Sequence, residues 1–305
     1  MKYAIISDIH GNMPALQKIL EDADAQGVQG FFLVGDYCIS APWAAEVVDA
    51  IRVLDNTWII KGNEENYMNV PNGTNGQFEI SRYGKSRLSE EQKKWLSGLP
   101  GKLDFQLENM EIHMIHNLED TTGKLGCWPV LTWQTAVHYG KEDVPHEQLL
   151  EDIRTELSGN ENFRNALEIL PSGIYIFGHN HLQWHMQTEN HLFINPGSCG
   201  IPLDCGEFGV PYTILNMENG RATVEERRLP LDAEEMIGLV KATSQYREAR
   251  VWSELIFGEW RSVREKTMFF LKFAEKFAQS IGDERRPFEK DTWEAAFEAW
   301  KCQVD

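Results

Sequence analysis

Two histidines stand one residue apart in the stretch Ile176-Phe177-Gly178-His179-Asn180-His181, directly behind an apolar run and a glycine. Side chains two positions apart in an extended chain point to the same side. Neutral imidazole is also a common metal ligand. His179 and His181 therefore indicate a metal site at the mouth of a buried strand, although spacing alone leaves structural histidines open as the alternative.

Carboxylate, amide and imidazole side chains follow the ends of four other apolar runs. In chain order they are Asp8 and His10, then Asp36, then Asn63 and Glu64, and later His116. Each motif alone fits a turn or a helix cap as well as a ligand, because Asp, Asn and Gly are common in turns and caps. The carboxyl ends of strands in an α/β sheet form the crevice where ligands normally bind. Polar side chains at five strand ends therefore favour one shared site.

The apolar runs alternate with amphipathic segments, and this rhythm predicts a layered α/β protein. Asn12 can cap a helix that buries Leu16 and Ile19, and Pro42 opens a second helix with Val48 on its apolar face. Strands are predicted at residues 3–7, 30–34, 57–60, 111–115, 174–177, 183–188, 191–194, 212–216 and 223–228. The later strands follow each other closely, as in hairpins, so the second half of the sheet is expected to be largely antiparallel.

The chain reads as helical after Pro230, and two further helices are expected within residues 141–170. The change of periodicity divides the chain into a domain of residues 1–230 and a C-terminal helical extension of residues 231–305 that packs on or caps it. Asp291 and Glu294 form a capping-box-like pair at the last helix. Apolar side chains recur at helical spacing through the extension: Trp252, Ile256, Trp260, Val263, Phe270, Phe273, Phe277, Trp293, Phe297 and Trp300. This stripe favours a hydrophobic core, with a roof over the site or a homo-oligomer surface as alternatives.

The 305-residue chain carries a net charge of −18, from 29 basic and 47 acidic residues, and shows no basic stripe. Bulk nucleic-acid binding is therefore disfavoured, whereas a small phosphorylated substrate held by metal is compatible with this charge. No run approaches the roughly 18 apolar residues of a membrane span, and the N-terminus lacks the features of a signal peptide, so a cytoplasmic protein is expected. Five cysteines at irregular spacing indicate neither a disulfide framework nor a thiolate zinc site.

The order of the five motifs, each behind its own strand, resembles the calcineurin-like metallophosphoesterase superfamily. The similarity extends beyond the candidate ligands. Asp8-Ile9-His10-Gly11-Asn12-Met13-Pro14-Ala15-Leu16 and Asn195-Pro196-Gly197-Ser198 resemble stretches of its small bacterial predicted-phosphoesterase branch. The resemblance runs from residue 1 to about residue 230 and implies an α/β, four-layer αββα sandwich.

The resemblance also implies a site with two divalent metal ions. Asp8, His10 and His181 would hold one ion, Asn63, His116 and His179 the other, and Asp36 would bridge both. Mixed imidazole and carboxylate ligands suit Mn, Fe, Zn, Co or Ni. Two ions about 3.5–4 Å apart can lower the pKa of a shared water, orient it in line and neutralise the developing phosphoryl charge. The implied function is phosphoester hydrolysis without a protein nucleophile.

Glu64 departs from the pattern of the superfamily, because many members have a histidine after the Gly-Asn pair. That histidine contacts phosphate and is proposed to protonate the leaving group. Three outcomes are open: Glu64 acts as the acid with a raised pKa, another group such as a residue of the extension replaces it, or substrates with good leaving groups need no acid. Branches without the histidine tend towards diesters, so phosphodiesters are favoured over monoesters. Asn117 is a second departure, since glycine commonly follows the histidine ligand.

A non-catalytic binding module is the alternative function, since the retromer scaffold subunit shares this fold and uses it for protein contacts. The chain keeps all seven candidate metal ligands, and their mutual desolvation costs free energy when no metal is bound. This retention favours the enzyme. An exposed aromatic extension would favour the scaffold.

Overall fold

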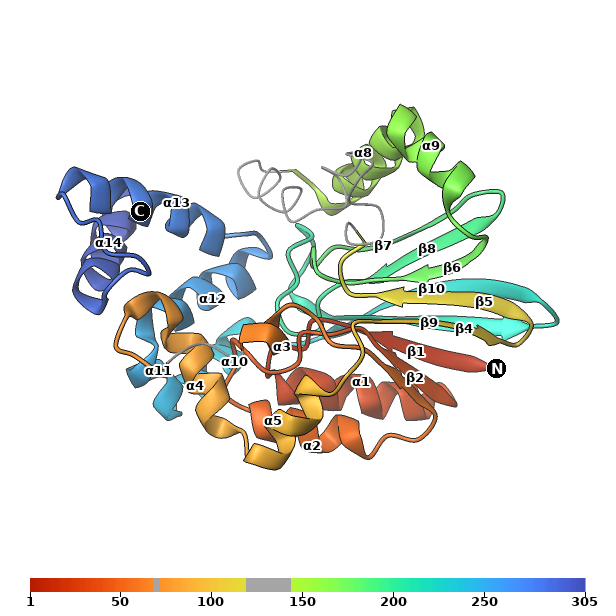
Figure 1. The fold of residues 1–305 in the computed structure, drawn as a ribbon, viewed down its shortest axis with the longest axis horizontal. Helices are drawn as coiled ribbons and strands as arrows, with labels where there is room; N and C mark the ends of the chain where they lie inside the picture. The colour runs from red at the N-terminus through yellow and green to blue at the C-terminus, as the bar shows by residue number, and fades with distance from the viewer. Residues whose placement is uncertain (68–71, 119–143, 305) are drawn as a thin grey trace.

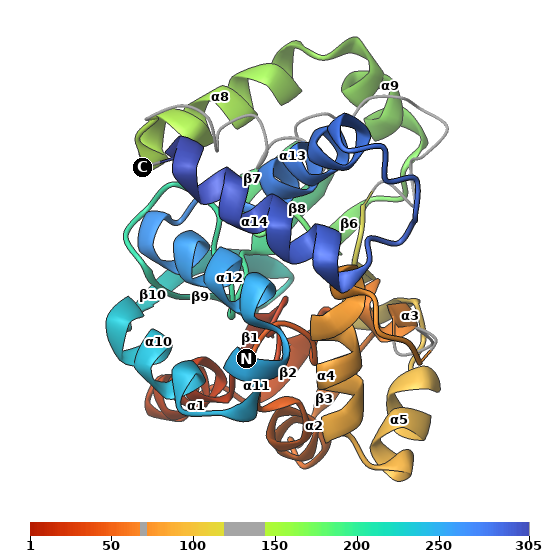
Figure 2. The same cartoon turned by 90° about the vertical axis from the view of Figure 1, so that its left-hand side faces the viewer.

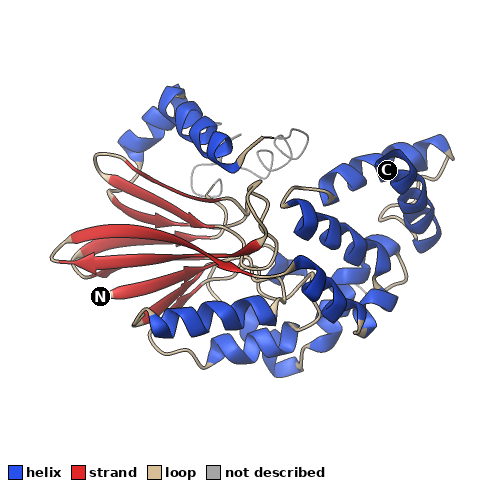
Figure 3. Ribbon diagram, turned by 180° about the vertical axis from the view of Figure 1, so that it is seen from behind, coloured by secondary structure: helices blue, strands red, loops and turns tan. Residues whose placement is uncertain are grey.

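Two five-stranded sheets face each other in the computed structural model, which describes residues 1–67, 72–118 and 144–304. Helices cover the outer face of each sheet, so the protein has four layers (Figures 1 and 3). The αββα sandwich expected from the resemblance is confirmed. Buried apolar side chains of both sheets, such as Ile5 and Ile176, form the core between them.

The first sheet combines parallel and antiparallel strands. From edge to edge it contains β10 (Arg221–Pro230), β9 (Gly209–Glu218), β1 (Lys2–Ile6), β2 (Gly30–Leu33) and β3 (Thr57–Ile59). Strands β1, β2 and β3 run parallel, whereas β9 runs antiparallel to β1 and to β10. Strand β1 runs from the labelled N-terminus towards the C-terminal helices (Figure 1). The carboxyl ends of the three parallel strands therefore lie at the end of the sandwich that these helices occupy.

The second sheet contains β4 (Lys102–Leu107), β5 (Met110–Ile115), β6 (Gly173–Ile176), β8 (His191–Pro196) and β7 (Gln183–Gln187), in that order. The hairpins β7–β8 and β9–β10 are antiparallel, as predicted. The prediction of a largely antiparallel second half is wrong for β5, β6 and β8, which pair in parallel. Strand β4 was not predicted, because its residues alternate between exposed and half-buried positions and form no apolar run.

The outer helices turn their apolar faces towards the sheets. On the first sheet lie α1 (Met13–Ala25), α2 (Ala44–Arg52), α4 (Glu79–Arg87) and α5 (Glu90–Ser97), and on the second lie α8 (His146–Gly159) and α9 (Glu161–Ile169). Asn12 caps α1 as predicted, because its side chain accepts a hydrogen bond from the Ala15 amide at 3.1 Å. Trp43 is the N-cap of α2, so Pro42 precedes this helix instead of opening it.

The C-terminal extension is helical, as predicted. It contains α10 (Ala233–Lys241), α11 (Ser244–Glu248), α12 (Arg250–Ser262), α13 (Thr267–Ser280) and α14 (Lys290–Val304). The ring centroid of Phe270 lies 4.7 Å from that of Trp293 and 5.5 Å from that of Phe297, and all three side chains are buried. These aromatic residues are thus the core of the extension. The predicted capping box is wrong, because α14 begins at Lys290 and Asp291 lies in its first turn.

The extension packs directly on the sandwich. A Cβ atom on Gly76, in the 3-10 turn Gly76–Phe78, would lie 2.6 Å from Cβ of Trp293, so only glycine permits this approach. The indole nitrogen of Trp252 donates to the carbonyl oxygen of Gln77 at 3.1 Å. Figure 2 looks at this end of the molecule and shows α12, α13 and α14 crossing it. None of the helices in the described ranges has both the length and the apolar composition that a membrane span requires.

Candidate metal centre

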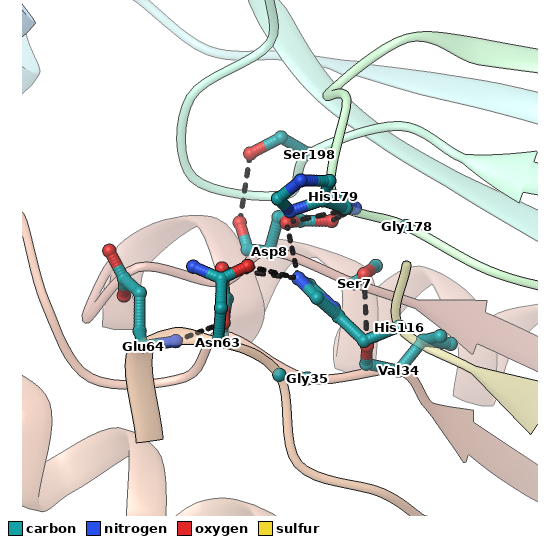
Figure 4. A network of polar contacts seen from close by, with 12 residues as sticks. Ser7, Asp8, Val34, Gly35, Asn63, Glu64, His116, Gly178, His179 and Ser198 are labelled. Atoms are coloured by element: carbon teal, nitrogen blue, oxygen red, sulfur yellow. Dashed lines mark hydrogen bonds and ion pairs between the residues drawn. The ribbon is translucent and has the colours of Figure 1, made fainter. Parts of the chain in front are cut away.

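The predicted site residues gather at the carboxyl ends of five strands from both sheets. Asp8 and His10 follow β1, Asp36 follows β2, Asn63 and Glu64 follow β3, His116 follows β5, and His179 and His181 follow β6. Asp8, Asn63, His116 and His179 point towards one another (Figure 4). Asp8 is fully buried, and His10, Asp36, Glu64, His116 and His181 are nearly so. The fold thus brings all eight residues into one region.

One cluster consists of Asp8, His10 and His181, whose ligand atoms lie within 4.8 Å of one another. Nε2 of His181 lies 3.4 Å from Oδ1 of Asp8 and 3.0 Å from Nε2 of His10. Two imidazole nitrogens that face each other at this distance repel unless a proton or a cation lies between them. The cluster therefore suits a bound cation.

A second cluster consists of Asp36, His116 and His179. Nε2 of His116 lies 3.2 Å from Oδ2 of Asp36 and 3.1 Å from Oδ1 of Asn63. Asp36 also belongs to a third group, with His10 and Glu64. The carboxylate of Asp36 is therefore shared between groups on both sides of the site.

Backbone carbonyls fix the tautomers of three histidines. Nδ1 of His10 lies 3.2 Å from the oxygen of Ile39, Nδ1 of His116 lies 2.6 Å from that of Val34, and Nδ1 of His181 lies 2.8 Å from that of Ile201. A carbonyl oxygen can only accept, so each Nδ1 carries a proton. Each Nε2 then faces the centre, where it can bind a metal ion once it has given up any proton of its own.

The electrostatics of the site favour positive charge at its centre. Burial alone would raise the pKa of Asp8 and Asp36, but the neighbouring imidazoles, His181 for Asp8 and His116 for Asp36, hold both below their ordinary values. Burial likewise opposes protonation of His10 and His116, yet the adjacent carboxylates raise the pKa of each to about 10. Burial and the nearby His116 lower the pKa of His179 to about 4. The carboxylates are thus ionised, and the donor set fits divalent transition metals.

The ligand-bearing loops adopt strained backbone. The φ angles are 52° for Asp8, 53° for His10, 56° for Asp36, 71° for His179 and 60° for His181. Each residue other than glycine pays of the order of 1–3 kcal/mol for such a conformation, and this cost persists only where the surrounding structure dictates it. The surroundings therefore impose the directions of these side chains.

Two glycines of the motifs are required by close contacts with the ligands. A Cβ atom on Gly62 would lie 2.1 Å from Oδ1 of Asp36, and one on Gly178 would lie 2.0 Å from Oγ of Ser7 and 2.6 Å from Oδ2 of Asp8. Real Cβ atoms do not approach other atoms so closely. This explains why glycine precedes the ligand residues in both motifs.

Glu65 orients the loops that carry Asp36 and Asn63, a role that the motifs in the sequence do not indicate. Its buried carboxylate accepts hydrogen bonds from the amides of Asp36 at 3.1 Å, Tyr37 at 2.9 Å and Gly62 at 2.7 Å. It thereby joins the loop after β2 to the loop after β3. Its position beside Glu64 in the motif was the only signal, and nothing in the sequence distinguishes the roles of these two carboxylates.

Ser198 and Asn195 support the loops from the opposite side. The hydroxyl of Ser198 donates to the carbonyl oxygen of Asp8 at 2.9 Å (Figure 4). The side-chain amide of Asn195 donates to the carbonyl oxygen of Gly178 at 2.9 Å and to Oδ1 of Asn180 at 2.8 Å. The Asn-Pro-Gly-Ser stretch that supported the resemblance therefore positions the loops that carry Asp8 and His179.

Glu64 lies beside His10, with Oε1 at 3.1 Å from Nδ1 of that histidine. Its amide donates to Oδ1 of Asp36 at 2.8 Å, and its Oε2 accepts from the amide of Ile39 at 3.2 Å. Burial raises the pKa of Glu64 to about 7, against the opposing effect of His10. Glu64 therefore stands at the edge of the clusters, where it can gain or lose a proton near neutral pH.

A cavity of about 290 Å³, which we call the chamber, lies between the clusters and the extension. Its floor contains His10, Asp36, Asn63, Glu64, His179 and His181, and its roof contains Trp252, Ile256 and Glu259 of α12 with Thr267 and Met268 of α13. The extension thus covers the candidate site. A roof over the site was one of the alternatives that the aromatic stripe allowed.

Histidine–carboxylate clusters at the strand ends of an αββα sandwich define the metallophosphoesterase class of proteins. The family model described as the calcineurin-like phosphoesterase superfamily domain matches residues 1–220, and the chain belongs to this superfamily. Membership of the superfamily and the clusters support a metal-binding protein of hydrolase type.

Solved structures share the fold at low sequence identity. A metallophosphoesterase from Sphaerobacter thermophilus is 18% identical, with a TM-score of 0.56 over 86% of this chain and 99% of that chain. A hypothetical protein from Pyrococcus horikoshii OT3 is 14% identical, with a TM-score of 0.57 over 84% of this chain and 97% of that chain. These likenesses show the fold alone. No curated protein matches the chain.

Proposed function

We propose that the protein is a dinuclear-metal-dependent phosphoester hydrolase that favours phosphodiesters over phosphomonoesters. The observation that carries the proposal is the pair of histidine–carboxylate clusters joined by Asp36 in a chain of the calcineurin-like phosphoesterase superfamily. Isolated buried carboxylates and imidazoles without a metal would cost free energy, so the clusters fit a site built for cations.

Seven residues hold the metals in this proposal. Asp8, His10 and His181 bind one ion, Asn63, His116 and His179 bind the other, and Asp36 bridges them. Manganese, iron, zinc, nickel and cobalt suit this mixed donor set. When bound, such a pair supplies an activated water nucleophile and neutralises charge on the phosphoryl group.

The charges of the chamber support the preference for diesters. Neither lysine nor arginine occurs among the described residues that line the chamber, and Glu64 and Glu259 both line it. The carboxylate of Glu259, and that of Glu64 whenever it is ionised, repel a dianionic monoester more strongly than a diester with a single charge. Glu64, with its pKa raised to about 7, can hold a proton on its carboxyl group near neutral pH and donate it to a leaving group.

The test is metal-dependent hydrolysis of bis(p-nitrophenyl) phosphate beside p-nitrophenyl phosphate. With Mn²⁺ we expect diester turnover to exceed monoester turnover. His181→Ala should abolish both activities, because it removes a ligand. His185→Ala is the matched control, since His185 lies on β7 and pairs with Glu226 at 2.6 Å, outside the clusters. Absence of turnover with Mn²⁺, Fe²⁺, Ni²⁺ and Zn²⁺ alike would contradict the proposal.

The scaffold alternative loses part of the feature that would favour it, although Phe273, Phe277 and Trp300 of the stripe are only half-buried. Phe270, Trp293 and Phe297 are buried within the extension and leave no exposed aromatic stripe from these three residues. Three expectations stay predictions: a homo-oligomer formed through the extension, a cytoplasmic location, and a domain boundary at residue 231. A small phosphorylated substrate is the partner that this proposal requires.

A further inference from the structure

The floor and the roof of the chamber differ in chemistry. The floor consists of candidate metal ligands together with Glu64, whereas Trp252, Ile256 and Met268 give the roof an apolar surface. A phosphoryl group must lie at the floor to reach the metals. Any substituent that points from it into the chamber therefore meets apolar side chains.

Hydrogen bonds hold the roof in place. The indole of Trp252 is tied to Gln77 at 3.1 Å, and the indole of Trp260 donates to the carbonyl oxygen of Gly200 at 2.8 Å. At the turn between α12 and α13, Oε1 of Glu259 accepts from the amides of Lys266 at 3.0 Å and Thr267 at 2.9 Å. The roof therefore forms a chamber of defined shape before a substrate enters.

A second cavity beside the clusters has a different lining. It has a volume of about 610 Å³, and Lys61 and Lys102 contribute to its walls. Asn63 and His179 line both cavities, so the two meet at the clusters. A polar or anionic substituent is better accommodated beside the lysines, which leaves the chamber for an apolar one.

We infer, on the basis of the proposed function, that the substrate is a phosphoester with one compact, uncharged, apolar arm that lies in the chamber. Trp252, Ile256 and Met268 are the specificity-determining residues in this inference. A chamber of about 290 Å³ is at the small end of ligand pockets, so it suits a single ring or a short branched chain beside the phosphoryl group. The roof carboxylate of Glu259 disfavours an arm with a negative charge.

Binding of two phosphinates to the full-length, Mn²⁺-loaded protein tests the inference. Dimethylphosphinate and methyl(phenyl)phosphinate each carry one negative charge and two P–C bonds, so neither contains an ester that can be cleaved. Calorimetric titration gives the two dissociation constants. The phenyl compound should bind roughly 10-fold or more tightly, because a ring is withdrawn from water into the chamber.

Substitutions in the roof locate the arm. Met268→Trp should reduce the ratio of the two dissociation constants to about threefold or less, since the indole fills the space of the ring. Met268→Ala should also lower the ratio, because contacts with the ring are lost. This second variant keeps the test valid if the larger Trp side chain impairs folding. Leu239→Trp, at a 42% exposed position of α10, is the matched control and should leave the ratio unchanged. Binding of dimethylphosphinate should stay the same in Leu239→Trp, because this variant leaves both the metal ligands and the lining of the chamber intact.

Hydrolysis of bis(p-nitrophenyl) phosphate by the same preparations separates the two proposals. Turnover by the natural protein with equal affinity for both phosphinates would overturn the inference and leave the function standing. A second outcome would also overturn the inference. If the protein turns over the diester but Met268→Trp and Met268→Ala leave the ratio of the two dissociation constants unchanged, the ring lies outside the chamber. If the protein shows no turnover and binds neither phosphinate, both proposals are overturned.

Discussion

The floor and the roof of the chamber are built in opposite ways. Most of the floor consists of loop residues in left-handed backbone, such as His10, Asp36 and His181, whose buried side chains are directed by their surroundings. The roof consists of regular helices with apolar side chains in ordinary packing. Loops of this kind tolerate little change, whereas helical faces accept substitutions of similar volume. Changes in the floor should therefore abolish activity, and changes in the roof should alter selectivity or stability.

Asp36→Asn should have the largest effect, because Asp36 belongs to two of the three ligand groups. Loss of its charge removes the proposed bridge. We expect kcat/KM for a diester to fall by roughly 1,000-fold or more, since the chemistry depends on both ions. Metal analysis by mass spectrometry should show fewer than two ions per chain. Asp55→Asn, at an exposed position before β3, is the control and should retain metal and activity.

Gly62→Ala tests whether close packing in the floor fixes the ligands. The added methyl group would lie 2.1 Å from Oδ1 of Asp36, so the carboxylate or the loop must move. We expect diester activity to fall by about 100-fold, as misplacement of about 1 Å can cause, and stability to fall by about 1–3 kcal/mol.

A glycine in the extension supplies the matched control for Gly62→Ala. Gly238 lies within α10, and a Cβ atom added there meets nothing within 4 Å. Gly238→Ala should keep full activity and raise the free energy of unfolding by about 0.5–1 kcal/mol, because alanine favours helix. Equal activity of the two variants would contradict the view that the floor is packed more strictly than the extension.

The contrast between floor and roof also explains which features the sequence could reveal. The candidate ligands can be recognised because each follows an apolar strand and several are preceded by a glycine that the packing demands, as at Gly62 and Gly178. The three bonds of Glu65 could not be predicted, since a buried carboxylate and an exposed one look alike in sequence. The roof depends on contacts such as that of Trp252 with Gln77, across 175 residues, and helical periodicity carries no information about such partners.

Glu64→Gln should have a smaller effect that depends on the leaving group. A protonated Glu64 can serve an alkyl leaving group, whereas p-nitrophenolate leaves without an acid. We expect the rate for an alkyl diester to fall by about 10-fold, and the rate for bis(p-nitrophenyl) phosphate to fall by less than about threefold. The natural protein should lose alkyl-ester activity as pH rises through about 7, where Glu64 gives up its proton. If Glu64→Gln and the natural protein show the same pH profile for hydrolysis of the alkyl diester, Glu64 is not the acid.

Glu265→Gln should have the smallest effect, on stability alone, because Glu265 lies in the turn between α12 and α13 and does not line the chamber. Burial raises the pKa of Glu265 well above its ordinary value, and the nearby Glu259 raises it further. A raised pKa in the folded state means that the stability from protonated Glu265 is complete below the unfolded value of about 4.3 and is lost as pH rises towards the folded value. Gln cannot ionise, so the variant should escape this loss.

The difference in melting temperature between Glu265→Gln and the natural protein is the measurement, taken from pH 4.5 to pH 8 in the same metal buffer. We expect this difference to increase with pH, because the raised pKa of Glu265 destabilises the natural protein progressively as the pH rises, and the variant has no carboxyl group to ionise. The exposed Glu189→Gln controls for loss of one negative charge and should give a difference that does not change with pH. Because Oε1 of Glu265 accepts from the amide of Met268 at 2.7 Å, and the Gln side-chain oxygen can do the same, the roof should keep its shape. If the variant gained stability but lost the preference for the phenyl arm, Glu265 would also influence the shape of the chamber.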